Sequence, residues 1–205
     1  LTKAPSISGD MTEKNVRMLT TKAIEFLLSC GSKMRLPQLT IATAVVYFQR
    51  FYVVHSLKKF DIFKIAAASL FLASKVEETP KKLKELVYTA WEMDPRRKPA
   101  EKEKGLPETS KDFESLKDKI LEHERELLRT MAFNLAVDHP YKYLLLSVKE
   151  IGGTKELAHF AWNFINDSLK TSICLQYKPQ IVACAVLDLV SKAMKVKLPG
   201  PPERS

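Results

Sequence analysis

Residues 61 to 80, DIFKIAAASLFLASKVEETP, decide the fold of this chain of 205 residues. Within them, residues 65 to 73 place apolar side chains on every side of a helix, which is typical of a helix that other helices surround. A short apolar run also fits a strand, but alanine favours a helix and disfavours a strand. Asp61 is a suitable N-cap, and Thr79 with Pro80 predicts the N-cap and first position of another helix. We therefore predict a buried central helix followed by a helix that begins at Pro80.

Charged residues follow the apolar run directly, with Lys75 first and Glu77 and Glu78 after it. A lysine is favourable at the C-terminus of a helix, where the helix dipole is negative, and glutamates are not. Two interpretations of this stretch remain open. The charges are either solvated at an ordinary helix end, or they form a charged docking point at the end of a rigid core.

Apolar residues at helical spacing predict seven further helices around the central one. Their expected ranges are 12–30, 37–54, 80–91, 110–131, 140–152, 154–171 and 179–194. Gly31 is the expected C-cap of the first. Residues 92–111, with three prolines and many charges, predict a mobile surface loop, and residues 133–137 an extended linker. Because the sequence shows no convincing strand pattern, the predicted fold class is all-α.

The helical pattern also repeats along the chain. Placing Lys192 on Lys75, an offset of 192 − 75 = 117 residues, aligns residues 183–189 with residues 66–72 and matches two further helix pairs. We therefore expect two related bundles, the first with five helices and the second with three. A three-helix bundle is expected to expose apolar surface, which indicates that the second repeat is incomplete and that the natural protein continues.

Composition limits the possible functions. Thirty-three Lys and Arg against 24 Asp and Glu give a net charge of +9, which suits nucleic acid, an acidic partner or solubility alone. The basic residues are scattered rather than interleaved with aromatics, so direct nucleic-acid binding is not expected. The cluster 96–98, Arg-Arg-Lys, fits a nuclear-import or acidic-partner signal or an ordinary solvated loop.

Cysteine and histidine spacing argues against a metal site or cofactor. The four histidines have no metal-ligand spacing with each other or with the cysteines. An odd number of cysteines without a Cys-x-x-Cys pair predicts buried thiols in a reducing intracellular compartment; these are Cys30, Cys174 and Cys184. The longest uncharged runs are too short to span a bilayer, so no membrane partner is expected.

Several motifs carry a resemblance to a known family. LASKVEE, residues 72–78, resembles the cyclin-box motif at the end of the third helix, and Glu124, nine residues before Phe133, resembles its partner glutamate in the fifth. VYFQRF, residues 46–51, is similar to the second-helix motif. KVEETPKK, DHPYKYLL and AWNFINDSLKT resemble in particular the transcriptional cyclins of the T, K and L types. The resemblance covers residues 12 to 198.

The resemblance implies a tandem cyclin-box fold, with a first box at residues 12–133 and a second, truncated box at residues 138–205. It also implies a nuclear, non-catalytic subunit that binds and activates a cyclin-dependent kinase phosphorylating the RNA polymerase II tail. Such a cyclin holds the kinase αC helix inward. The glutamate of that kinase helix then pairs with the kinase lysine that positions ATP. Other transcription or splicing factors are further possible partners, and the T, K and L types share these motifs.

Carried over by position, the family pattern gives a kinase-binding set. Lys75 and Glu124 would pair with each other and hydrogen-bond kinase backbone just before αC. The surrounding contact surface would come from Leu72, Glu78, Leu128, Phe133 and Leu135. For the three leucines, plain core packing remains an open alternative.

One docking site of the cell-cycle cyclins is not expected here. Those cyclins carry a first-helix patch of the Met-Arg-Ala-Ile-Leu type that binds Arg-x-Leu substrates. The corresponding residues 19–23 read Leu-Thr-Thr-Lys-Ala, so the arginine and two aliphatic residues are missing. We predict that Arg-x-Leu peptides do not bind.

Two other function classes remain as alternatives. The cyclin fold is shared with general transcription factor IIB, so a module that binds nucleic acid or transcription factors is one of them. It predicts steeply salt-dependent duplex binding. An enzyme is the other, but the sequence has six glycines, no phosphate-binding loop and no nucleophile motif. Adjacent Glu77 and Glu78 point apart on a helix and make a poor acid–base pair.

Overall fold

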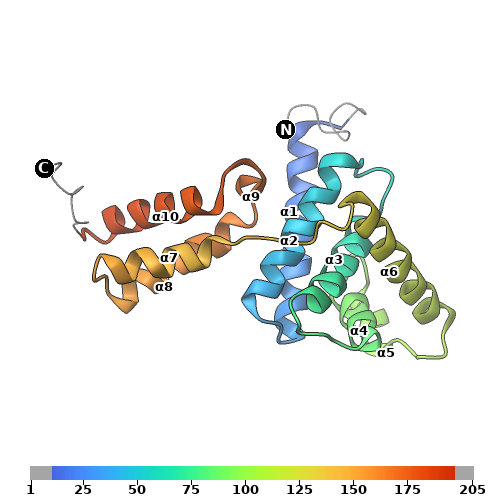
Figure 1. The fold of residues 1–205 in the computed structure, drawn as a ribbon. Helices are drawn as coiled ribbons and strands as arrows, with labels where there is room; N and C mark the ends of the chain where they lie inside the picture. The colour runs from blue at the N-terminus through green and yellow to red at the C-terminus, as the bar shows by residue number, and fades with distance from the viewer. Residues whose placement is uncertain (1–10, 197–205) are drawn as a thin grey trace, which may run out of the picture. The chain divides into compact units, whose positions relative to one another are not determined.

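A computed structural model describes residues 11–196 of the chain (Figure 1). It divides between Val137 and Asp138 into two compact units, which are described separately below. All regular elements within residues 11–196 are helices, which confirms the predicted all-α class.

The first unit is built around the predicted central helix. Its helices are α1 (Glu13–Lys33), α2 (Gln38–Val54), α3 (Ile62–Val76), α4 (Leu83–Met93), α5 (Pro99–Lys104) and α6 (Lys111–Thr130). Helix α3 packs against α1, α2, α4 and α6, and Figure 1 shows it between α2 and α6. Ile65, Ala66, Ala67, Ala68 and Leu70 are each at most 1% exposed, as expected for a helix that is apolar on all sides.

Asp61 is the N-cap of α3, as predicted. Its Oδ1 accepts hydrogen bonds from the backbone N–H of Phe63 at 3.0 Å and of Lys64 at 3.2 Å. The next prediction is wrong, because α4 begins at Leu83 rather than at Pro80. The N–H of Thr79 instead closes the end of α3 by donating to the carbonyl of Ser74 at 2.8 Å. A local capping pattern was thus overridden by the helix that precedes it.

Gly31 does not end α1. The helix continues to Lys33, and Gly31 is buried where α1 meets α2. A Cβ added at Gly31 would lie 2.7 Å from Cγ1 of Ile41. The glycine is therefore required for the close approach of two helices, and the left-handed residue after α1 is Arg35, with φ of 52°.

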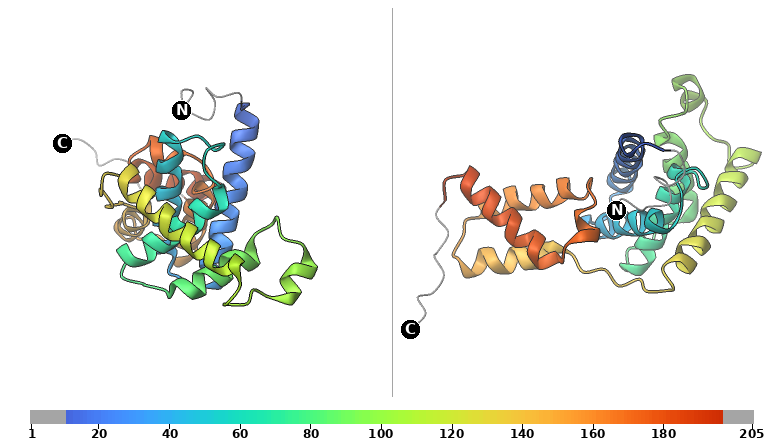
Figure 2. Two further views of the ribbon diagram at one scale, coloured as in Figure 1. Left: turned by 90° about the vertical axis from the view of Figure 1, so that its right-hand side faces the viewer. Right: turned by 90° about the horizontal axis from the view of Figure 1, so that it is seen from above.

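Residues 92–111, predicted to form a loop, contain the short helix α5 (Pro99–Lys104). Pro99 occupies a first-turn position, where its missing N–H carries no penalty. Both views in Figure 2 show the segment with α5 standing away from the other helices of its unit. Arg97 lies over Trp91 at 5.0 Å from the ring centroid.

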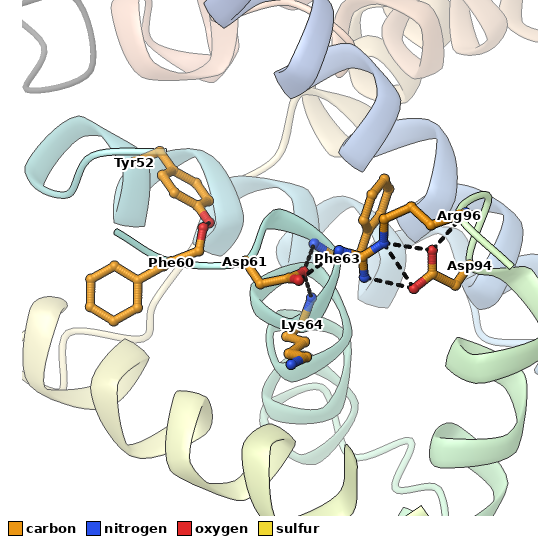
Figure 3. Close-up of polar contacts among 7 residues, drawn as sticks. All are labelled: Tyr52, Phe60, Asp61, Phe63, Lys64, Asp94 and Arg96. Carbon is orange, nitrogen blue, oxygen red and sulfur yellow. Dashed lines mark hydrogen bonds and ion pairs between the residues drawn. The ribbon is translucent and has the colours of Figure 1, made fainter. Parts of the chain in front are cut away.

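Arg96 connects residues 92–111 to the start of α3 (Figure 3). Its guanidinium lies 2.6 Å from Oδ2 of Asp61 and 2.6 Å from Oδ2 of Asp94, and it stacks over Phe63 at 4.6 Å from the ring centroid. Burial alone would raise the pKa of Asp61, but hydrogen bonding and charge from Arg96 lower it overall. This basic residue is thus committed to contacts within the chain.

The second unit contains α7 (Pro140–Glu150), α8 (Lys155–Ser168), α9 (Ile173–Gln176) and α10 (Pro179–Ala193). Helices α7, α8 and α10 pack against one another, as the right-hand view of Figure 2 shows. Shifted by 117 residues, the bounds of α3 become 179–193, which are those of α10. Lys192 of α10 therefore occupies the position of Lys75, but it pairs with Asp188 of its own helix at 2.7 Å.

Apolar side chains are exposed on the second unit, as predicted, although it contains the short helix α9 besides the three helices expected. Those between 41% and 57% exposed are Leu145, Leu146, Phe160, Phe164, Tyr177, Ile181 and Leu189. The prediction of buried thiols holds for Cys30 alone, because Cys174 is half-buried and Cys184 is exposed. Burial raises the pKa of the Cys30 thiol to about 12.

Candidate functional site

The two charged residues singled out in the sequence form an ion pair between helices. Lys75 lies in the last turn of α3, and its ammonium contacts Oε1 of Glu124 on α6. The side chain of Glu124 is only 9% exposed, whereas that of Lys75 is 43% exposed. The carboxylate therefore sits at the base of the pair, and the ammonium remains within reach of a partner.

An aromatic ring also holds the ammonium. The Nζ of Lys75 lies 4.2 Å from the ring centroid of Phe71, one turn earlier on α3. A cation over an aromatic face is stabilised by about 0.5–1 kcal/mol at an exposed site. Lys75 is therefore oriented by two groups, one on its own helix and one on α6.

The helices that supply this pair end in the same way. At the end of α3, Glu78 has a φ of 54°, and the N–H of Thr79 donates to the carbonyl of Ser74. At the end of α6, Ala132 has a φ of 47°, and the N–H of Phe133 donates to the carbonyl of Leu128 at 3.1 Å. Both are Schellman motifs with a residue other than glycine at the left-handed position, which is a strained conformation.

The remaining predicted site residues differ in exposure. Phe133 is 70% exposed and itself has a left-handed φ of 59°. Glu78 is also exposed, whereas Leu128 and Leu135 are half-buried. Leu72 is only 4% exposed, so most of its surface is used in the core of the first unit. The core-packing alternative therefore has most weight at Leu72.

Comparison with known protein families matches both units. The description "Cyclin, N-terminal domain" matches residues 4–136, and "Cyclin-T2-like, C-terminal domain" matches residues 139–205. The chain belongs to the cyclin family. Its similarity to T-, K- and L-type members confirms the resemblance to transcriptional cyclins noted from the motifs.

Three relatives illustrate that similarity. Cyclin-T1-5 of Arabidopsis thaliana is 38% identical over 202 residues, which are 98% of this cyclin and 34% of the relative. Cyclin-K of Homo sapiens is 38% identical over 177 residues, with coverages of 84% and 29%. Cyclin-L1-1 of A. thaliana is 35% identical over 202 residues, with coverages of 98% and 48%. The chain thus spans less than half the length of each relative.

Solved structures agree on the fold. A chain in the crystal structure of the yeast RNA Pol II CTD kinase CTDK-1 complex matches 94% of this cyclin and 60% of its own length, with a TM-score of 0.81 and 20% identity. A chain of the CAK complex from Chaetomium thermophilum bound to ATP-gamma-S matches 92% and 58%, with a TM-score of 0.67 and 19% identity. At such identities the likeness concerns the fold alone.

Sequence reasoning missed the polar residues of α2 that contact the ends of α3 and α6. These are Thr40, Thr43 and Tyr47. A signal was present, because positions 40, 43 and 47 follow the i, i+3, i+7 spacing of one helix face. It was not recognised because the surrounding residues of the helix are mainly apolar.

Metal clusters and membrane-spanning helices are absent from the described part of the chain. Among residues 11–196 there is no group of three or more His, Cys, Asp or Glu side chains placed to hold a metal ion. Nor does any helix in that range have the length and apolar character needed to cross a membrane. The pair of Lys75 and Glu124, which joins α3 to α6, is the candidate functional site of the first unit.

Proposed function

We propose that this chain is the regulatory subunit of a transcriptional cyclin-dependent kinase that phosphorylates the RNA polymerase II C-terminal domain in the nucleus. It binds and activates the kinase and performs no catalysis itself. The observation that carries the proposal is the ion pair of Lys75 and Glu124, with a buried carboxylate beneath a reachable ammonium. The T-, K- and L-type relatives support the same assignment.

The site suits a partner that supplies backbone acceptors. On a free surface an ion pair contributes about 0–1 kcal/mol, because water screens it. When a kinase covers the pair, removing either residue leaves the other charge buried and costs roughly 2–5 kcal/mol. Activation further requires the chain to bind the active kinase state more tightly than the inactive one, by about 5 kcal/mol to convert a mostly inactive population to a mostly active one.

The segments that follow α3 and α6 add two exposed side chains to the proposed contact surface. Glu78 and Phe133 both have left-handed backbones and exposed side chains. In the proposal they flank the pair and contact the kinase, together with Leu128, Leu135 and the small exposed part of Leu72. The proposed boxes are residues 12–133 and 138–205.

The test begins with identification of the kinase. The tagged chain is used to capture proteins from a nuclear extract of cells of its source organism. Mass spectrometry then identifies the kinase that is recovered. That kinase is then produced recombinantly, and binding and phosphorylation of a heptad-repeat peptide are measured. Lys75→Ala alone, which leaves the carboxylate of Glu124 without its partner, is expected to bind at least about thirtyfold more weakly, the equivalent of 2 kcal/mol. The Lys75→Ala, Glu124→Ala double variant loses the contacts of both residues with the kinase and is expected to fail to activate it.

A matched control comes from another ion pair in the same unit. Lys84 of α4 contacts Glu108, and both side chains are about half exposed, at 54% and 52%. The Lys84→Ala, Glu108→Ala variant should bind and activate the kinase like the original chain. Normal activation by the Lys75→Ala, Glu124→Ala variant would rule out the proposal. A gel shift with duplex DNA at moderate salt tests the nucleic-acid alternative.

A further inference from the structure

Three polar residues form one face of α2 in the core of the first unit. Thr40, Thr43 and Tyr47 follow i, i+3, i+7 spacing and are each at most 1% exposed. Buried polar side chains are destabilising unless they are hydrogen-bonded. The partners of these three lie in two other segments of the chain, one after α3 and one after α6. We refer to the three residues as the α2 polar face.

The first two residues hold the segment after α3. The hydroxyl of Thr43 donates to Oε1 of Glu77 at 2.7 Å, and the hydroxyls of Thr40 and Thr79 are 3.0 Å apart. These contacts lie on either side of Glu78, the strained residue of that segment. The left-handed turn is therefore held from both sides by one helix.

The third residue holds the segment after α6. The hydroxyl of Tyr47 donates to the carbonyl of Leu135 at 2.6 Å, two residues beyond Phe133. Burial raises the pKa of Tyr47 to about 12, and the charge of Glu77 acts in the same direction. The phenol is therefore protonated and able to donate at neutral pH.

We propose that Thr43 and Tyr47 are positioning residues for kinase binding. By holding the segments after α3 and α6 on one rigid helix, they fix how Lys75 and Glu78 lie relative to Phe133 and Leu135. Neither residue is exposed enough to touch a partner, so both act through the segments that they hold. The inference rests on the proposed function and deepens it.

The contacts made by Thr43 and Tyr47 are important because the segments after α3 and α6 contain non-glycine residues in a left-handed conformation, which is unfavourable by itself. Glycine is the usual residue at the left-handed position of a Schellman motif, and a side chain there adds strain. Without the contact from Thr43, residues 77–79 have less to hold them in that conformation. A surface that must be rebuilt during binding loses affinity, since part of the interaction energy is used to order it.

The experiment removes single hydroxyls without changing side-chain shape. Thr43→Val and Tyr47→Phe are compared with Thr43→Ser, which restores the hydroxyl. Tyr52→Phe is the matched control, because the hydroxyl of Tyr52 on the same helix donates to the carbonyl of Phe60 at 3.2 Å, away from the α2 polar face. Each 205-residue chain is titrated with a recombinant kinase subunit of the class that phosphorylates the RNA polymerase II C-terminal domain.

Thr43→Val is expected to weaken kinase binding about tenfold, which corresponds to 1.4 kcal/mol. Thr43→Ser should recover most of that affinity. Amide hydrogen exchange at Glu78 and Thr79 in the free chain should be about tenfold faster in Thr43→Val, because their hydrogen bonds open more often. Tyr47→Phe should weaken binding about fivefold, the effect of losing one hydrogen bond, and Tyr52→Phe should bind normally.

A double-mutant cycle with Lys75→Ala separates positioning from general destabilisation. If Thr43 acts through the end of α3, then Thr43→Val should cost much less affinity in the Lys75→Ala background than alone. Fully additive effects, or unchanged affinity and exchange in Thr43→Val, would overturn the inference. These outcomes differ from the result expected if the proposed function is wrong. In that case Lys75→Ala alone would leave kinase binding unaffected.

Discussion

Nε2 of His55 and the hydroxyl oxygen of Thr130 lie 2.8 Å apart, which links the end of α2 to the end of α6. The Thr130 hydroxyl donates its only proton to the carbonyl of Glu126 at 2.8 Å. His55 must therefore be the donor, which assigns the proton to Nε2. The imidazole also packs on Phe51, with ring centroids 4.4 Å apart, and on Phe60, at 5.1 Å.

This arrangement predicts that the first unit becomes less stable in mild acid. Burial lowers the pKa of His55, as does the charge of nearby Lys59, while Glu126 opposes them; burial likewise lowers the pKa of His123. Because both folded pKa values lie below the unfolded value of about 6.5, the unfolded chain binds more protons as the pH falls. Stability should be constant above that value and decline below it.

Urea denaturation at pH 7.5 and pH 5.5 measures the effect. His55→Gln, which keeps a donor for Thr130, should reduce the difference between the two midpoints. His159→Gln is the control, because His159 is exposed. An unchanged pH dependence in both His55→Gln and His123→Gln would assign the acid sensitivity to other groups.

Glu78 should lower the stability of the fold while strengthening kinase binding. Replacing it with glycine relieves a left-handed side-chain conformation, so Glu78→Gly should raise the free energy of unfolding by about 1 kcal/mol. The same variant should bind the kinase more weakly if Glu78 belongs to the contact surface. Chemical denaturation and kinase titration measure the two effects, and Ala132→Gly should give the stability gain with a smaller change in affinity.

Gly31 should not tolerate a side chain. Gly31→Ala places a Cβ 2.7 Å from Ile41 Cγ1 and 2.8 Å from its Cδ1, closer than these atoms can approach without a shift. Overpacking of this kind should lower the free energy of unfolding by about 1–3 kcal/mol, although alanine itself favours the helix. Differential scanning calorimetry should show that the double variant Gly31→Ala, Ile41→Ala recovers part of the lost stability. A Gly31→Ala chain as stable as the original would contradict the close packing of α1 and α2.

Arg96 should stabilise the fold more than a typical surface arginine. Arg96→Ala removes contacts with Asp61, Asp94 and Phe63, and should lower the free energy of unfolding by about 1–2 kcal/mol, more than the 0–1 kcal/mol of an isolated surface pair. The pKa of Asp61 should rise towards its ordinary value, measured by NMR titration. Because that pKa is depressed in the folded chain, the stability from Asp61 is present above about pH 4 and lost as the pH falls further. An effect no larger than that of the Lys84→Ala, Glu108→Ala variant would contradict this role.

The sequence was most informative where structure depends on local pattern. The apolar run after Asp61 predicted both the central helix and its cap, because periodicity and capping are properties of neighbouring residues. The 117-residue offset predicted related helices for the same reason. The association of Lys75 with Glu124, which are far apart in sequence, came from family resemblance rather than from spacing.

The misassignments share a physical cause. Gly31 and Thr79 both fit helix-end patterns, but each is used in a contact with α2 that lies outside its local sequence. The α2 polar face was missed in the same way, because the partners of Thr43 and Tyr47 are 34 and 88 residues away. Local patterns predict helices well, whereas contacts between helices depend on the completed fold.

The two copies of the central helix have diverged in one respect that bears on stoichiometry. Lys192 in α10 matches Lys75 in α3, but it neutralises an aspartate one turn away and is 73% exposed. Of these two equivalent lysines, only Lys75 is paired with a carboxylate from a second helix. We therefore expect the assembly to be one-to-one, with a single kinase seated on the first unit of each chain.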